Sequence, residues 1–202
     1  MNPYREIQAK LSLTQPLPYT PDWSASADFV DLIVEYCLQA SPEVIVECSS
    51  GLTTLVMARC CQINNRGRVI SLENGEEYVE KTRQQLKQFG LEEYAQVIHA
   101  PLAKVVLDRE YDWYSLDALP EVSIDMLVID GPSGFIQKNS RYPALPLLFE
   151  KFSDQARVFL DDAARDDEKE LVEQWQTEYP DIDHGYLEFK RGCSVLRINQ
   201  TD

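Results

Sequence analysis

The chain has 202 residues, of which 44% are hydrophobic and 10% aromatic, and it carries a formal net charge of −15. This length and composition suit one globular domain with an ordinary core. A surface this acidic repels phosphate backbones and anionic lipids, so neither nucleic acid nor a membrane is an expected partner.

The N-terminal segment predicts no targeting or membrane element. It lacks the apolar core of a secretory signal, and no stretch of the chain approaches the roughly 18 uncharged apolar residues of a membrane helix. Residues 1–25 are rich in Pro, Thr and Ser and predict an irregular arm, followed by a single domain over 26–202. The five cysteines are an odd number at irregular spacing. They predict reduced, buried thiols and a cytoplasmic protein.

Helical spacing of apolar residues begins after Ser26, a candidate N-cap, and stops at Pro42. From there strands and helices alternate. The predicted strands cover 44–48, 68–73, 95–100, 124–130 and 156–162, and the predicted helices cover 52–63, 76–89, 141–152 and 166–179. Residues 184–199 differ, because two strand-like runs are joined by Lys190-Arg191-Gly192, as in a hairpin.

This order predicts an α/β fold with a doubly wound, Rossmann-like sheet. Alternating strands and helices form parallel, right-handed units with helices on both faces. The sheet is expected to have seven strands, mostly parallel, and to end in an antiparallel hairpin. In such sheets ligands bind beyond the C-terminal ends of the strands, so the residues that follow each strand are the candidates for a site.

The first strand is followed by a turn of small residues. Gly51 lets a ligand approach the backbone, and Ser49, Ser50 and Thr53 flank it. Glu47 is expected to accept hydrogen bonds from backbone donors that shape the turn, and all five residues are candidates for contact with the ligand. A dinucleotide fingerprint requires further glycines, so a ligand without a pyrophosphate is favoured. The alternative is a plain strand-to-helix turn with Ser49 or Ser50 as N-cap.

The second and third strands end in groups suited to a nucleoside. Glu73 ends the second strand, and its two oxygens could accept hydrogen bonds from a ribose diol. His99, near the end of the third, could border an adenine ring. Otherwise Glu73 is a solvated loop residue and His99 an ordinary hydrogen-bonding one. The turn and Glu73 together favour nucleoside binding.

The fourth and fifth strands end in carboxylates, Asp130, Asp161 and Asp162, which are expected to converge at the reacting end of the ligand as catalytic groups. They could bind Mg²⁺, which prefers oxygen ligands. Alternatively one could act as a general base without a metal. In a third interpretation Asp161 or Asp162 merely caps the next helix.

The segment after the fourth strand predicts an acceptor pocket. Arg141 and Tyr142 are expected to form its wall, with Arg141 facing an anionic group of the substrate. Three aromatic residues, Trp23, Trp113 and Tyr114, are expected either to cover the cofactor and acceptor or to belong to the core.

These segments resemble the motifs of class I S-adenosylmethionine-dependent methyltransferases, over about residues 26–199. Residues 45–54 resemble motif I, Ser71-Leu72-Glu73 the acidic ribose-binding motif and residues 125–132 motif IV, while Phe159-Leu160-Asp161-Asp162 matches the end of the fifth strand. Within the superfamily the chain is most similar to bacterial proteins of undefined substrate. The aspartates also resemble the Mg²⁺ site of catechol-type O-methyltransferases, but Asp162 stands where those enzymes have Asn, and the base lysine three residues after Asp130 is missing.

The resemblance implies transfer of a methyl group from S-adenosylmethionine to an oxygen or nitrogen of a small-molecule acceptor. Gly51 and its neighbours would then seat the methionine part, Glu73 the ribose, and Asp130 the methyl-transfer end of the cofactor. Two alternatives stay open: a non-catalytic module that binds S-adenosylmethionine or another nucleoside, and an NAD-binding oxidoreductase. A requirement for Mg²⁺ and assembly as a homodimer are also left open.

Overall fold

The computed structural model describes residues 3–199. Its helices are α1 (Arg5–Lys10), α2 (Ala27–Ala40), α3 (Leu52–Asn64), α4 (Glu76–Phe89), α5 (Ala144–Leu148), the 3₁₀ turn η1 (Phe149–Lys151) and α6 (Asp166–Glu178). Its strands are β1 (Val44–Cys48), β2 (Arg68–Glu73), β3 (Ala95–His99), β4 (Leu102–Val106), β5 (Glu110–Tyr114), β6 (Ile124–Ile129), β7 (Phe152–Asp161), β8 (Asp183–Leu187) and β9 (Cys193–Arg197).

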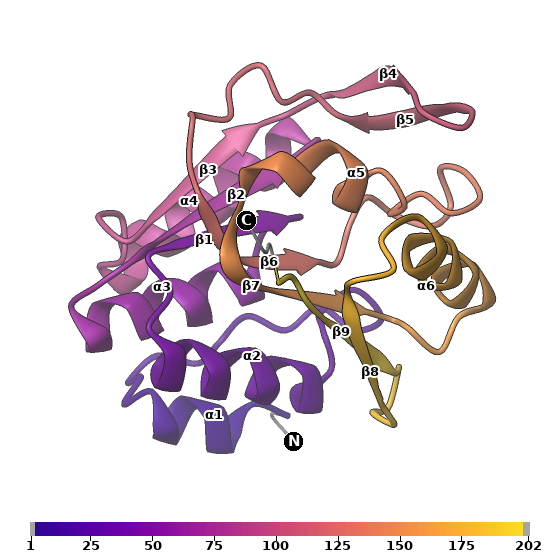
Figure 1. Cartoon of the computed structure of the whole chain (residues 1–202). Helices are drawn as coiled ribbons and strands as arrows, with labels where there is room; N and C mark the ends of the chain where they lie inside the picture. Colours follow the sequence, from indigo (N-terminus) through magenta and orange to yellow (C-terminus); the bar gives the residue numbers. More distant parts are fainter. Residues whose placement is uncertain (1–2, 200–202) are drawn as a thin grey trace.

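A seven-stranded sheet in the order β3-β2-β1-β6-β7-β9-β8 organises the molecule (Figure 1). The first five strands in this order, β3, β2, β1, β6 and β7, are mutually parallel. The last two are antiparallel to their neighbours, because β9 pairs antiparallel with both β7 and β8. The predicted fold class is therefore confirmed, including the closing hairpin.

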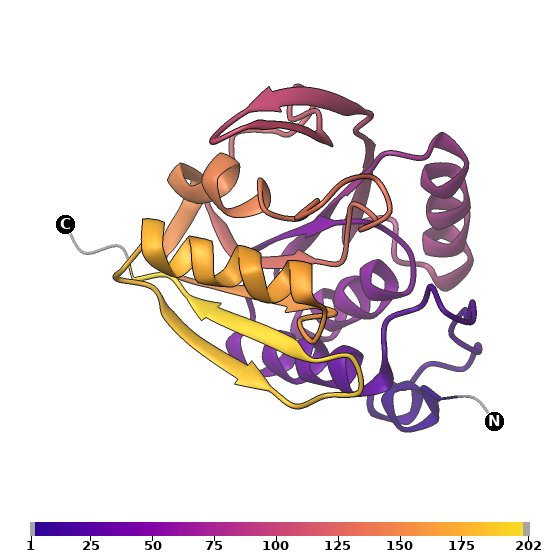
Figure 2. The same ribbon diagram turned by 90° about the vertical axis from the view of Figure 1, so that its right-hand side faces the viewer.

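The strand order reverses at β1, which lies between β2 and β6. Cys48, the last residue of β1, pairs with Leu72 of β2 and Ile129 of β6, so these three strands end at the same level. Figure 2 views the molecule from the side toward which β1 and β6 point in Figure 1. Parallel sheets of this kind bind ligands at this switch point.

Both faces of the sheet are buried, which explains the continuous apolar runs in the sequence. Ile45 packs with the helices α2, α3 and α4 on one face, whereas Val46 packs with α5 and α6 on the other. The same alternation places Val128 on the first face and Leu127 on the second. All five cysteines are buried and free, as predicted.

Two features differ from the sequence-based expectation. The arm expected to be irregular over 1–25 contains the helix α1, whose Ile7 is buried and packs in the core of the first face. The hairpin β4–β5 was not predicted and forms a separate two-stranded sheet. Its signal is an alternation in β5, where Tyr111 and Trp113 are buried while Glu110 is exposed. The neighbouring strand β4 has no such alternation, since none of its residues is buried.

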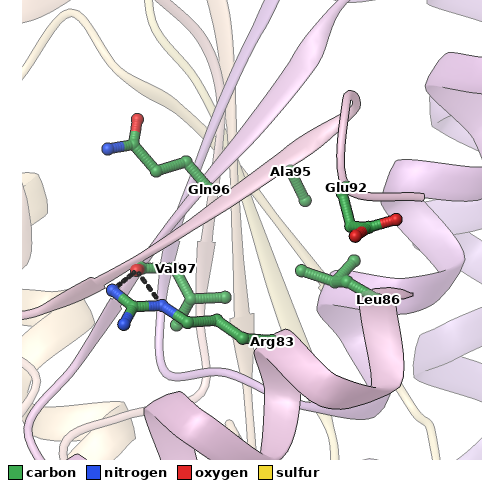
Figure 3. A pocket seen from close by; sticks show the side chains of 6 residues that line it. All are labelled: Arg83, Leu86, Glu92, Ala95, Gln96 and Val97. Atoms are coloured by element: carbon green, nitrogen blue, oxygen red, sulfur yellow. Dashed lines mark hydrogen bonds between the residues drawn. The ribbon is translucent and has the colours of Figure 1, made fainter. Parts of the chain in front are cut away.

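The edge of the sheet at β3 is covered by a side chain. Arg83 of α4 donates two hydrogen bonds to the carbonyl oxygen of Val97, from Nη2 at 2.8 Å and Nε at 3.3 Å (Figure 3). A hollow of about 270 Å³ lies beside this contact, against Ala95, Gln96 and Val97 in the first part of β3. It is therefore separate from the C-terminal ends of the strands. A guanidinium on an edge carbonyl hinders pairing with a further strand.

No helix within residues 3–199 is both long and apolar enough to cross a membrane.

Candidate functional site

The turn after β1 presents bare backbone. Ser49 has φ +126° and Gly51 has φ +131°, a region that side chains disfavour. A Cβ on Gly51 would meet nothing within 4 Å, so this residue faces open space. The helix α3 begins at Leu52, and the N–H groups of a first helical turn have no partner inside the helix. Backbone donors are thus available here to a ligand.

Glu47 supports the turn from below. Its carboxylate is fully buried and accepts hydrogen bonds from the hydroxyls of Thr53, Thr54 (2.6 Å) and Ser71 (2.5 Å). Burial raises the pKa of Glu47 to about 7, against the opposing effect of these hydroxyls. Both Glu47 and Thr53 were expected to contact the cofactor, and this is corrected for their side chains, which are buried against each other. The donors that reach Glu47 are hydroxyls rather than the expected backbone groups.

Glu73 and Ser50 meet at the rim of the turn. The Ser50 hydroxyl donates to Oε2 of Glu73 at 2.8 Å, and the backbone N–H of Gly75 donates to Oε1 at 2.9 Å. The Ser50 oxygen also lies 3.1 Å from the hydroxyl of Thr82. His99 is exposed and stands in register with Glu73 on the neighbouring strand. The structure thus brings Ser50 and Glu73 together beside Gly51, and it places His99 on the strand next to Glu73.

The loop after β6 packs directly onto this turn. A Cβ on Gly131 would collide with the hydroxyl of Tyr114 and would lie 3.3 Å from both the Cys48 oxygen and the Ser49 Cβ. Tyr114 and its neighbour Trp113 are buried in the core, which settles their role as packing residues. Trp23, by contrast, is 67% exposed.

The three aspartates converge as expected. Asp130, Asp161 and Asp162 each offer an oxygen, and these atoms lie within 4.8 Å of one another. Their exposure differs, since Asp161 is fully buried, Asp162 is nearly so, and the side chain of Asp130 is 15% exposed. Of the three, Asp130 is the group that an acceptor can reach.

The guanidinium of Arg141 lies among these carboxylates. Nη2 is 2.6 Å from the backbone oxygen of Asp130, 3.5 Å from its Oδ1 and 3.0 Å from Oδ2 of Asp162. Nη1 donates to the backbone oxygen of Asp161 at 2.9 Å and lies 3.6 Å from Oε1 of Glu168. The acceptor-pocket role expected of Arg141 is therefore corrected, because its charged end points into the protein.

Tyr142 is corrected for the same reason. It is 3% exposed, and its hydroxyl lies 2.8 Å from both carboxylate oxygens of Glu178. Its ring packs on that of Tyr111 with centroids 5.3 Å apart. A side chain held on two sides in this way forms core rather than the wall of an acceptor pocket.

Two further arginines approach Asp162 from the solvent side. Arg165 Nη1 is 3.0 Å from Oδ2 of Asp162, and Arg191 Nη1 is 3.8 Å from Oδ1. A divalent cation would need these same oxygens as ligands at about 2.0–2.6 Å. On Asp161, Oδ1 accepts the N–H of Asp162, which leaves Oδ2 as an unpartnered buried oxygen. Because Oδ2 of Asp162 is already paired with both Arg141 and Arg165, this donor set does not fit a divalent cation while the arginines are in place.

Burial and mutual repulsion control the acidity of the cluster. Burial, followed by the charge of Asp161, raises the pKa of Asp130 well above its usual value, and Arg141 opposes this. Burial and the neighbouring Asp162 raise the pKa of Asp161 to about 6. Burial lowers the pKa of Arg141, but the surrounding carboxylates, Asp130 first, have the larger combined effect, so the net result is a raised pKa. Asp130 is thus a stronger base than an ordinary aspartate, which suits a group that accepts a proton.

Four residues of the site were not predicted as such: Thr54, Ser71, Glu168 and Arg191. Thr54 bonds both Glu47 and the N–H of Gly51, at 2.6 and 3.0 Å, and so closes the N-terminus of α3. A threonine three residues after the cap residue could have signalled this. Arg191 and Glu168 reach the cluster through tertiary folding, for which the sequence has no local signal.

Comparisons with known proteins agree with this geometry. A family model described as a methyltransferase domain matches residues 46–163, which is more than half of the chain. No curated protein matches.

Solved structures share the fold at low sequence identity. The O-methyltransferase TomG from Streptomyces achromogenes, solved with S-adenosylmethionine, has a TM-score of 0.67 and 13% identity, over 99% of this chain and 100% of that one. The Podospora anserina methyltransferase PaMTH1, bound to S-adenosylhomocysteine, has 0.69 and 14%, over 96% and 94%. A Bacillus cereus O-methyltransferase complex with S-adenosylhomocysteine has 0.68 and 13%, over 96% and 88%.

The family match covers the turn after β1, the end of β2 and the aspartates of β6 and β7. The order of the sheet and the position of the candidate site agree with it. The chain belongs to the methyltransferase domain family.

Proposed function

We propose that this protein binds S-adenosylmethionine at the ends of β1 and β2 and transfers its methyl group to an oxygen or nitrogen of a small molecule. One observation carries the proposal: the Glu73 carboxylate lies at the rim of the open turn around Gly51, 2.8 Å from the Ser50 hydroxyl. Its oxygens suit a ribose diol. The names of the similar structures, which include complexes with S-adenosylmethionine or S-adenosylhomocysteine, support the choice of nucleoside.

The turn argues against a dinucleotide. Ser49 and Thr54 stand where two glycines of the dinucleotide fingerprint would be, and the Thr54 hydroxyl already takes the N–H of Gly51. Glu47 below the turn adds negative charge whenever it is ionised, which a pyrophosphate would oppose. A sulfonium cofactor carries no such anion, so it suits this site better than NAD does.

In the proposed reaction Asp130 accepts a proton. The acceptor oxygen or nitrogen forms a bond to the methyl carbon, the bond from that carbon to sulfur breaks, and the acceptor's proton passes to the Asp130 carboxylate. Asp130 suits this role because it is the least buried member of the cluster and has a raised pKa. The main acceleration in such a displacement comes from holding donor and acceptor in line. Asp161 and Asp162 are buried and are assigned a positioning role.

The proposed partner is a small-molecule acceptor. A net charge of −15 disfavours nucleic acid, and the buried free thiols support a cytoplasmic location. The Asp162 carboxylate is already paired with Arg141 and Arg165, so no step is assigned to Mg²⁺.

Calorimetric titration with S-adenosylhomocysteine tests the proposal. We expect micromolar affinity, about −8 kcal/mol, and no comparable binding of NAD. Glu73→Ala should weaken binding by at least about tenfold, because the ribose loses its acceptors. Glu77→Ala, an exposed neighbour on α4, serves as the matched control. Absence of binding by the folded wild-type protein would overturn the proposal.

Binding alone does not distinguish an enzyme from a non-catalytic module. Formation of S-adenosylhomocysteine from S-adenosylmethionine should therefore be followed in the presence of phenol, carboxylate and amine acceptors. Turnover that Asp130→Asn abolishes while cofactor affinity persists would support the catalytic assignment. Cofactor binding without turnover on any of these classes would favour a sensing or scaffolding module instead.

A further inference from the structure

The acidic cluster at the ends of β6 and β7 contains its own counter-ion. Four carboxylates meet there, those of Asp130, Asp161, Asp162 and Glu168, and the Arg141 guanidinium lies among them at 3% exposure. A buried charge of this kind is retained when it is paired and hydrogen-bonded on several sides.

The position of the guanidinium is that of a bridging ion. Nη2 lies 3.0 Å from Oδ2 of Asp162 and 3.5 Å from Oδ1 of Asp130. A divalent cation that joined the same two oxygens would have to stand between them, at the place Nη2 occupies. The guanidinium and such an ion therefore exclude each other.

The chain fixes Arg141 in this place from both sides. The backbone oxygens of Asp130 and Asp161 accept its Nη2 and Nη1 at 2.6 and 2.9 Å. Next to it, the Ser140 hydroxyl donates to the Pro132 oxygen at 3.2 Å, and the N–H of Asn139 donates to Asp167 at 3.1 Å. Arg141 is thus a bonded part of the cluster rather than a mobile surface charge.

We infer that Arg141 takes the place of a divalent cation between Asp130 and Asp162, so that this protein uses an internal guanidinium where a metal-dependent relative would bind an ion. The inference about ion binding stands independently of the proposed function. Its extension, that methyl transfer needs no divalent cation, rests on that function.

Mn²⁺ binding, followed by electron paramagnetic resonance without cofactor or acceptor, tests the inference. Wild-type protein should leave the spectrum of free Mn²⁺ unchanged up to about millimolar concentration. Arg141→Ala removes the competing charge and opens the space between the carboxylates, so it should bind Mn²⁺ at least about tenfold more tightly than wild type. The same ion should raise the Tm of this variant and leave the wild-type Tm unchanged.

Two further variants separate the role of Arg141 from a general loss of positive charge. Arg165→Ala also removes a cation beside Asp162, but that side chain is half exposed and leaves the central position filled. It should gain no Mn²⁺ affinity. Arg141→Lys keeps a positive charge and should bind the ion no better than wild type.

Several outcomes would overturn the inference. Micromolar Mn²⁺ binding by wild type would show that ion and guanidinium coexist, and unchanged affinity in folded Arg141→Ala would show that the carboxylates form no ion site. If Arg141→Ala is insoluble, recovery of soluble protein by Mn²⁺ during refolding supports the inference. If Arg141→Ala is insoluble and Mn²⁺ does not recover it, Arg141→Met replaces it in the titration under the same criteria, because methionine keeps most of the side-chain volume of arginine.

Measurements of turnover test the metal-free reaction separately from ion binding. With an acceptor in hand, a chelator should leave the rate unchanged, whereas loss of activity on chelation would refute the metal-free reaction. If no acceptor is ever found, the proposed function fails while the Mn²⁺ result is unaffected.

Discussion

Replacing Glu47 by Gln should change how stability depends on pH. The carboxyl of Glu47 is fully buried, and its pKa rises on folding from the ordinary 4.5 to about 7. The folded state therefore binds more protons than the unfolded state between these values, so stability is lost as the pH rises through the window. At 1.36 kcal/mol per pKa unit, ionisation of Glu47 lowers the free energy of unfolding by about 3 kcal/mol in total. About 2–3 kcal/mol of this loss develops between about pH 5 and about pH 8.

Glutamine keeps the shape of Glu47 and removes its charge. Its oxygen can accept from two of the hydroxyls that bond Glu47, while its NH₂ group donates to the third. We expect a constant offset at low pH and a growing advantage of Glu47→Gln over wild type as the pH rises. Subtracting the two profiles cancels other titrating groups, including Asp161.

Urea unfolding at a series of pH values provides the assay. The fluorescence of the three tryptophans reports unfolding, because Trp113 and Trp175 are fully buried. Glu93→Gln, on an exposed residue, is the matched control and should run parallel to wild type. Parallel profiles for Glu47→Gln and wild type would refute the reasoning, since they would mean that Glu47 keeps an ordinary pKa in the folded protein.

Three further predictions concern the packing around the site. Ser49→Gly should stabilise the fold by about 1 kcal/mol, because φ +126° strains a serine, and equilibrium denaturation would show it; a destabilised variant would contradict the strain. Gly131→Ala should destabilise by about 1–3 kcal/mol through the collision with the Tyr114 hydroxyl. Tyr114→Phe in the same chain should restore part of that loss, and a double-mutant cycle without coupling would rule the collision out. The five buried thiols should react with a thiol reagent only on unfolding, and fast labelling of native protein would disprove their burial.

The fold was predictable because the strands of a parallel sheet have a strong signal. Runs such as Ile124–Ile129 are apolar on both faces. The closing hairpin had a signal of its own, because its turn ends in Gly192, which has φ +72°. The hairpin β4–β5 escaped prediction because no residue of β4 is buried, so its sequence has no alternation of apolar and polar residues. The helix α1 escaped because six residues carry too little periodicity for a confident pattern.

The positions of the carboxylates in the site were more predictable than the position of the arginine that pairs with them. Strand ends in a parallel sheet meet at one edge, so the convergence of Asp130 with Asp161 follows from topology alone. The direction of a long side chain does not. Arg141 follows β6 by twelve residues and could have pointed outward; only the folded chain shows that it turns inward to the carboxylates.

The contact between Gly131, Ser49 and Tyr114 also limits how this scaffold can be redesigned. A Cβ at Gly131 would meet the turn after β1 and the end of β5 at once, so these two segments and the loop after β6 cannot be altered independently. A design that enlarges a side chain in one of these three segments therefore requires compensating changes in the other two. At Phe135, which is 94% exposed, that restriction no longer applies, so substitutions there should leave the packing around Gly131 undisturbed.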